Sequence, residues 1–210
     1  MDIKIEGEGN QILIEETVNL NNSSIRIQGN YNRVYIGRTA YMVRVHIRFP
    51  DNAEKFCDNR EVFIGKNCYI GQLVVNCGDD NHKVYIGERC ALSDNISLRT
   101  VDGHTIYNSD TFDVLNDGDG SIIIGEHVWL GSGVRFLKGS GVGAHSTVGA
   151  GSIVTKKYTE ERIILGGVPA KKIKDNINWN FINTAGVKER MASPLENSEF
   201  IEELIKDNIK

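Results

Sequence analysis

Aliphatic side chains recur every six residues over the second half of the chain. The unbroken series of anchors is Ile124, Leu130, Phe136, Val142, Val148 and Val154. Four anchors are followed directly by a glycine, at Gly125, Gly131, Gly143 and Gly149. Four positions after each of the first five anchors stands a small or β-branched residue: Val128, Val134, Ser140, Ser146 and Ser152. This pattern predicts short strands between tight turns, with the anchors pointing inward.

A longer period lies over the hexads in the first half of the chain. Residues 3–14 match residues 25–36, and Ile64 and Ile86 are likewise 22 apart. A period of 18 is three hexads, and a period of 22 is three hexads plus a small insertion. We therefore predict an all-β parallel β-helix of triangular coils, since one coil cannot bury its own apolar face. The glycines are expected to supply the backbone conformation of the turns.

Two other all-β folds also alternate aliphatic residues with glycines. They are the β-sandwich and the right-handed β-helix. Five unbroken steps of six, with the small-residue rule kept, favour the hexapeptide coil over both. The handedness of the coil does not follow from the spacing.

Two gaps in the period predict inserted segments. Ile36 and Ile64 are 28 apart, so one coil carries extra residues. Ile86 and Ile124 are 38 apart, and this excess includes a polar stretch that predicts an exposed loop at about 103–120.

The end of the chain changes its periodicity. Apolar residues recur at helical spacing at Ile201, Leu204, Ile205 and Ile209. The expected domains are therefore a β-helix over 1–180 and a tail over 181–210 that holds a short C-terminal α-helix.

Composition narrows the classes of partner. The 210 residues carry a formal net charge of −4, and Lys and Arg are scattered along the sequence, so no nucleic-acid partner is expected. No run approaches the roughly 18 apolar residues of a membrane span, and the first residues lack the apolar core of a signal peptide. The four cysteines form no close metal-binding pairs, so we expect reduced thiols in a cytoplasmic protein and no metal.

Four motifs follow one another in order between about residues 60 and 175. They are Asp94-Asn-Ile-Ser-Leu-Arg-Thr-Val-Asp-Gly-His104, Ile123-Ile-Gly-Glu-His-Val-Trp-Leu-Gly-Ser132, Val148-Gly-Ala-Gly-Ser-Ile-Val-Thr-Lys156 and Gly167-Val-Pro-Ala-Lys171. With the hexads, they resemble the hexapeptide-repeat acyltransferases, and most of all the sugar and polysaccharide O-acetyltransferases. The resemblance implies left-handed winding, acetyl-CoA as co-substrate, and a homotrimer with active sites between subunits. It implies a sugar or bacterial polysaccharide acceptor of the capsule, O-antigen or sialic-acid type.

The same resemblance assigns roles to residues at matching positions. His104 would be the general base for the acceptor hydroxyl, a task that suits a side chain whose pKa lies near working pH. Trp129 would shape the acetyl-CoA site beside the reaction. The groove for the pantetheine arm would be lined by Ser132 and Ala150, stacked on adjacent coils. Thr155 and Lys156 would reach the adenosine end, with Lys171 and Lys174 as candidate phosphate partners.

The acceptor site rests on fewer residues. The pair Asp79-Asp80 stands where sugar acetyltransferases carry an acidic residue, with Asp80 taken as the contact. Gln72 or Asn76 would have to substitute for an asparagine that the family places slightly upstream. Asp102 is a candidate to orient His104, or simply forms the turn.

Three alternatives stay open. The acceptor nucleophile could be the amine of an amino sugar or an antibiotic instead of a hydroxyl. A β-helix metalloprotein of the carbonic-anhydrase kind would use His82 and His104, which are 22 apart, and bound zinc would reveal it. A silent scaffold or sugar-nucleotide sensor would have no chemical need for Trp129, Lys156 and the Gly-Val-Pro-Ala turn together.

Overall fold

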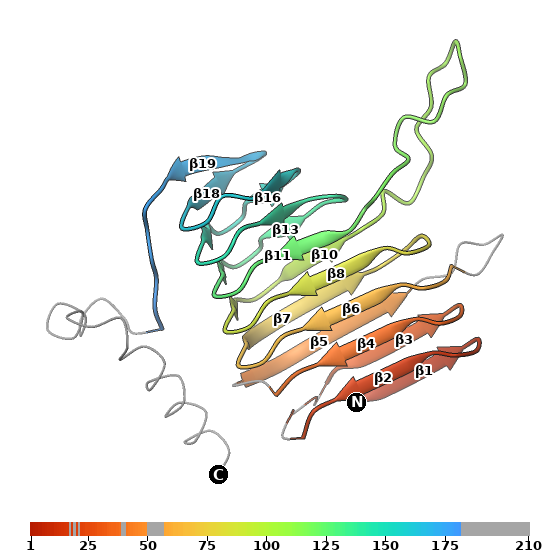
Figure 1. Ribbon diagram of the computed structural model, residues 1–210, viewed down its shortest axis with the longest axis horizontal. Coiled ribbons are helices and arrows are strands. Elements are labelled where there is room, and N and C mark those ends of the chain that lie inside the picture. The colour runs from red at the N-terminus through yellow and green to blue at the C-terminus, as the bar shows by residue number, and fades with distance from the viewer. Residues whose placement is uncertain (17, 19, 21, 39–40, 50–56, 182–210) are drawn as a thin grey trace, which may run out of the picture.

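Strands dominate the computed structural model, which describes residues 1–16, 18, 20, 22–38, 41–49 and 57–181. Every strand pair is parallel except the last, and the coils stack along one axis (Figure 1). No helix occurs among these residues, and the predicted C-terminal α-helix lies outside them. The all-β parallel prediction is therefore confirmed, whereas left-handed winding stays a prediction.

Two sheets form the walls of the stack. The smaller sheet consists of β2 (Gln11–Ile14), β4 (Arg33–Ile36), β6 (Glu61–Ile64), β8 (Lys83–Ile86), β11 (Ile122–Ile124), β14 (Gly141–Val142) and β17 (Lys157–Tyr158). The larger sheet consists of β1 (Asp2–Glu6), β3 (Ser24–Gln28), β5 (Tyr41–Phe49), β7 (Tyr69–Asn76), β9 (Ala91–Leu92), β10 (Ile96–Arg99), β12 (Trp129–Leu130), β13 (Arg135–Phe136), β15 (Thr147–Val148), β16 (Ile153–Val154), β18 (Ile164–Gly167) and β19 (Ala170–Lys174).

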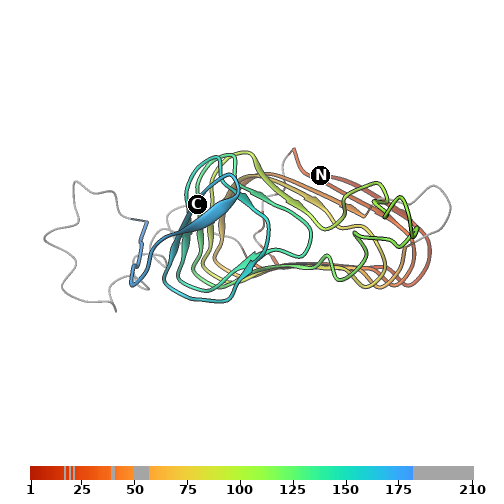
Figure 2. The ribbon, with the colours of Figure 1, turned by 90° about the horizontal axis from the view of Figure 1, so that it is seen from above.

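The larger sheet divides at β7. Tyr69 at its start pairs with Ala91 of β9, whereas Asn76 at its end pairs with Arg99 of β10. Beyond this point each coil has three short strands, and the stack becomes a three-sided prism. The earlier coils, with their period of 22, carry two described strands each, one of which reaches nine residues in β5. Figure 2 shows the stack from above.

The strand register confirms both periods. Ile64 pairs with Ile86 at a separation of 22, and Ile124 pairs with Val142 at a separation of 18. The two long gaps are also single coils, because Ile36 pairs with Ile64 and Ile86 with Ile124. All six hexad anchors lie in one continuous hydrophobic core, and the small residues four positions after the first five anchors are buried as well.

The glycines of the hexads serve a different purpose from the predicted one. A Cβ on Gly125 would lie 2.5 Å from the Ala144 backbone nitrogen, and one on Gly131 would lie 2.6 Å from that of Ala150. The left-handed backbone conformation occurs two positions later, at His127 and Gly133. These glycines are therefore required by the close approach of adjacent coils and not by their own φ angles.

One loop leaves the prism between β10 and β11. Its two legs pair at an antiparallel bridge between Tyr107 and Val114. Figure 1 shows it standing away from the stack, as the gap of 38 predicted. Among the described residues, no helix is long and apolar enough to cross a membrane.

Candidate active site

A pocket of about 530 Å³ lies at the base of this loop. Its lining includes His104, Asp102, Asp79, Arg99, Asn116 and Lys138. The structure thus brings together the predicted base, its candidate orienting residue Asp102, one residue of the predicted acidic pair and three polar side chains that the sequence did not single out.

Asn116 holds the two legs of the loop together beside His104. Its Nδ2 donates to the backbone oxygen of His104 at 2.9 Å and to Asp102 Oδ2 at 3.0 Å. Its Oδ1 accepts from the backbone nitrogen of Ile106 at 2.8 Å. The carboxylate of Asp102 therefore bonds to an amide that fixes the backbone of His104. The His104 side chain itself is exposed and available to a substrate.

Two cations share this pocket. Arg99 donates from Nε to the backbone oxygen of Val101 at 2.9 Å, and Lys138 donates from Nζ to that of Asn116. These bonds hold both side chains against the loop base. Charged donors beside a general base can bind an anionic acceptor or stabilise a developing oxyanion.

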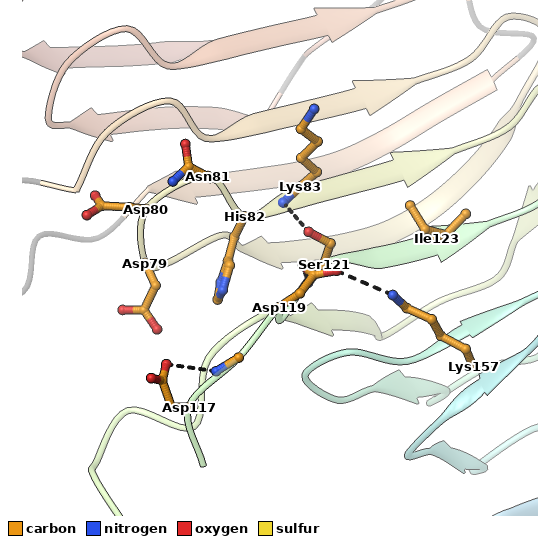
Figure 3. A pocket seen from close by; sticks show the side chains of 11 residues that line it. Asp79, Asp80, Asn81, His82, Lys83, Asp117, Asp119, Ser121, Ile123 and Lys157 are labelled. Atoms are coloured by element: carbon orange, nitrogen blue, oxygen red, sulfur yellow. Dashed lines mark hydrogen bonds and ion pairs between the residues drawn. The ribbon is translucent and has the colours of Figure 1, made fainter. Parts of the chain in front are cut away.

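Figure 3 shows a second pocket, of about 810 Å³. It shares Asp79 and Asp117 with the first pocket. Lys157 Nζ lies 3.4 Å from Asp119 Oδ2. Hydrogen bonds from Ser121, with Lys157 nearby, lower the pKa of Asp119 to about 2. This carboxylate is therefore ionised at any working pH, and it neutralises the lysine beside it.

His82 lies in the second pocket with both ring nitrogens engaged. Its Nε2 accepts from the backbone nitrogen of Gly120 at 3.1 Å, and its Nδ1 lies 3.3 Å from Thr100 Oγ1. Metal ligation by His82 would have to break one of these bonds. Among the described residues, no three His, Cys, Asp or Glu side chains are grouped to hold a metal ion.

Asp80 forms part of the prism corner. Its Oδ1 accepts a hydrogen bond from the backbone nitrogen of Asp58 at 2.8 Å. In the same way, Asp58 Oδ1 accepts from the backbone nitrogen of Asn30, and Asn30 Oδ1 accepts from that of Glu8. This ladder gives Asp80 a structural partner on the next coil. The exposed carboxylate of the predicted pair, which lines both pockets, is Asp79.

Basic side chains stack into one column on the outer face of the larger sheet. The register places Lys4 beside Arg26, Arg26 beside Arg48, and Arg48 and Arg99 on either side of Asn76. All four cations are exposed, and the column ends at Arg99 in the His104 pocket. The expectation that basic residues are scattered is therefore wrong in space. Asn76 belongs to this column and not to either pocket.

The predicted acetyl-CoA residues lie elsewhere on the prism. Ser132 and Ala150 stack on adjacent coils as predicted, with the backbone nitrogen of Gly151 donating to the Ser132 oxygen at 2.8 Å. Trp129 is 43% exposed on β12. The remaining four are exposed on the last coils, at Thr155, Lys156, Lys171 and Lys174. None of these residues lines the pocket of His104.

The chain is similar to known acetyltransferases over nearly its whole length. A polysialic acid O-acetyltransferase of Neisseria meningitidis is 30% identical over 194 residues, which cover 83% of this chain and 87% of that protein. The crystal structure of the polySia specific acetyltransferase NeuO matches with a TM-score of 0.67 and 27% identity, covering 97% of this chain and 98% of that one. The polysialic acid O-acetyltransferase OatWY matches with a TM-score of 0.63 and 25% identity, covering 94% and 100%. No protein-family model matches the chain.

Proposed function

The chain belongs to the hexapeptide-repeat O-acetyltransferases, and from this premise we propose that it moves an acetyl group from acetyl-CoA to a hydroxyl of an acidic polysaccharide. The observation that carries the choice of acceptor is the basic column from Lys4 to Arg99. The similarity to enzymes named for polysialic acid supports the same choice.

The column has a cost that an anionic ligand would offset. Like charges placed opposite one another on adjacent strands are destabilising. Adjacent strands lie about 4.8 Å apart, so the first three coils present Lys4, Arg26 and Arg48 at that repeat. Asn76 takes the next position, and Arg99 follows one coil later. A polymer with a carboxylate on every sugar would gain several charge-assisted contacts along this face and would be led into the pocket of His104.

His104 would act as the base for the transfer. Its imidazole takes the proton of the acceptor hydroxyl while the hydroxyl oxygen attacks the thioester carbonyl carbon. The carbon–sulfur bond then breaks, and the same imidazole returns the proton to the departing thiolate of CoA. Asn116 fixes the backbone from which this side chain works, and Arg99 and Lys138 supply positive charge in the pocket.

We place the complete site between two subunits of a homotrimer. In one chain His104 lies at the loop base, whereas Trp129, Ser132 and Ala150 lie on other parts of the prism. A neighbouring copy would bring the two sets together. Left-handed winding and a cytoplasmic location belong to the same proposal.

The test is CoA release from acetyl-CoA with polysialic acid, a neutral glucan and an amino sugar as acceptors. We expect turnover on the anionic polymer, and a fall of about 10² or more in His104→Ala. The matched control is Leu115→Ala, an exposed side chain of the same loop that should leave the rate unchanged. Hydroxylamine should release the product's acetyl group, because it cleaves esters and spares amides. Equal rates in His104→Ala, or a product that resists hydroxylamine, would contradict the proposal.

A further inference from the structure

The chain segment after β19 crosses the outside of several coils. The backbone nitrogen of Ile177 donates to the oxygen of Arg162 at 3.0 Å, on the last coil. Trp179 Nε1 donates to the oxygen of His127 at 2.8 Å, and the ring of Phe181 lies 6.5 Å from that of Tyr69. Residues 177–181, here called the crossing segment, thus run back from the end of the prism toward β7.

The crossing segment packs against a column of exposed aromatic rings. The register places Tyr41, Tyr69, Ala91 and Trp129 in one line on the larger sheet. Tyr69 and Trp129 are 42% and 43% exposed, yet the small Ala91 between them is only 8% exposed. The crossing segment contacts both aromatic neighbours of this alanine, Tyr69 through Phe181 and Trp129 through Trp179.

Trp179 stacks on His127, which in turn contacts His145. Its ring stacks on that of His127 with centroids 4.5 Å apart and planes 14° apart. His127 Nδ1 lies 3.2 Å from His145 Nδ1, and His145 Nε2 lies 3.5 Å from Glu126 Oε1. Three contacts therefore fix Trp179: the stack, the indole hydrogen bond to the His127 backbone and the packing of Phe181 at 5.0 Å.

From this geometry we infer that Trp179 is a positioning residue for acetyl-CoA, acting by holding the ring of Trp129. The two indoles lie 6.1 Å apart at 40°, so Trp179 limits the orientations open to Trp129, which is still 43% exposed. A ring that is ordered before binding loses less conformational freedom when the ligand arrives. The inference rests on the proposed function, because it takes Trp129 as part of the acetyl-CoA site.

The position of Trp179 also connects to the predicted phosphate contacts. β19 carries Lys171 and Lys174 and runs directly into the crossing segment. Docking of Trp179 therefore anchors the far end of the strand that presents these lysines. Loss of Trp179 should weaken the hold on the nucleotide end of CoA as well as on its thioester end.

The test is CoA affinity by titration calorimetry for the full chain, Trp179→Ala and Trp179→Phe. We expect the alanine variant to raise Kd by about 3- to 10-fold, the loss expected of one aromatic contact, and the phenylalanine variant to recover part of it. In turnover, KM for acetyl-CoA should rise while KM for the polysaccharide stays constant. The matched control is Tyr41→Ala, which removes an exposed ring of the same column that stacks on Tyr69.

The outcomes separate this inference from the proposed function. An unchanged Kd in Trp179→Ala, with only a lower melting temperature, would make the crossing segment a structural staple and would overturn the inference alone. A native protein that binds no CoA would overturn the proposed function and the inference with it. An equal rise of Kd in Tyr41→Ala would show a general effect of the aromatic column and would also overturn the inference.

Discussion

His104 and His127 are the same residue type in opposite surroundings. His104 is exposed beside a pocket, whereas His127 is covered by Trp179 and faces a second imidazole at 3.2 Å. Burial, followed by the charges of His145 and Arg89, lowers the pKa of His127 to about 4. His127 is therefore neutral at neutral pH and suited to stacking, whereas the His104 side chain is exposed beside the pocket.

The lowered pKa of His127 predicts loss of stability in acid. Its neutral form is favoured by folding, so the stabilisation is complete above the unfolded pKa of about 6.5 and is lost as pH falls toward 4. After allowance for solvent screening of the partly covered ring, the full effect is on the order of 1–2 kcal/mol in the free energy of unfolding. Urea denaturation between pH 7.5 and pH 4 should show a shallower pH dependence in His127→Asn, which tolerates the left-handed backbone at this position.

Carboxylates contribute to acid sensitivity in the same direction, so the comparison of variants decides the outcome. Asp119 also has a lowered pKa and loses stabilisation as pH falls. Asp119 is present in both proteins, and its contribution cancels in the difference. Parallel pH profiles for the native chain and His127→Asn would contradict the assignment.

At the scale of the element, the hexad predicts which residues form strands and face inward, but it does not predict the contacts between coils. The period of six identified the strands and inward-facing anchors such as Leu130, because burial repeats with the coil. The predicted reason for Gly131, a turn conformation, is wrong, because the pattern contains no information on the distance between adjacent coils. The loop at Gly103 was located by its excess length, yet the role of Asn116 was missed, since its contacts cross 12 residues of irregular chain.

Two glycines at the same hexad position make a matched test of coil approach. An added Cβ at Gly131 would meet the Ala150 backbone at 2.6 Å, whereas the nearest atom at Gly149 would be 3.5 Å away. Gly131→Ala should therefore lower the free energy of unfolding by about 1–3 kcal/mol, and Gly149→Ala by less than about 0.5 kcal/mol. Urea denaturation measures both. Equal losses of unfolding free energy in the two variants would contradict the role of the local contact at Gly131 and indicate a general backbone effect of replacing glycine.

At the scale of the whole molecule, stacking of the coils places residues that are one period apart in the sequence side by side on one face. Lys4, Arg26 and Arg48 are each 22 apart, which is the period already found for the aliphatic residues. Applying that period to the charges would have revealed the column. The continuation to Arg99 was not accessible in this way, because insertions change the spacing between Arg48 and Arg99 to 51.

The column predicts polymer-specific effects of charge removal. Arg48→Gln should raise KM for a long anionic polysaccharide several-fold, with KM for acetyl-CoA unchanged, and should make the rate less sensitive to salt. Arg33→Gln is the matched control, because Arg33 is an exposed arginine on the smaller sheet, paired with Glu61 at 3.2 Å. An equal rise of KM in both variants would show that net charge alone matters and would contradict a specific role of the column.

A site shared between subunits predicts complementation between two inactive variants. His104→Ala and Trp129→Ala each damage one side of the site. Refolded together, mixed trimers should contain sites built from one intact half of each chain, with about a quarter of native activity for random mixing. Activity no greater than the sum of the separate variants would place both residues in the same subunit's site.

Each coil pairs only with its neighbours, and the described crossing segment contacts the coils from β7 onward. Coils can therefore be added near the N-terminus without rebuilding the catalytic end. Duplication of one 22-residue unit near the N-terminus would add a rung of about 4.8 Å to the basic face and leave the loop of His104 untouched. The length of the basic face is then set by the number of 22-residue units that the gene encodes. Selection on coil number would tune the shortest glycan that the enzyme modifies efficiently, independently of the chemistry performed at the far end.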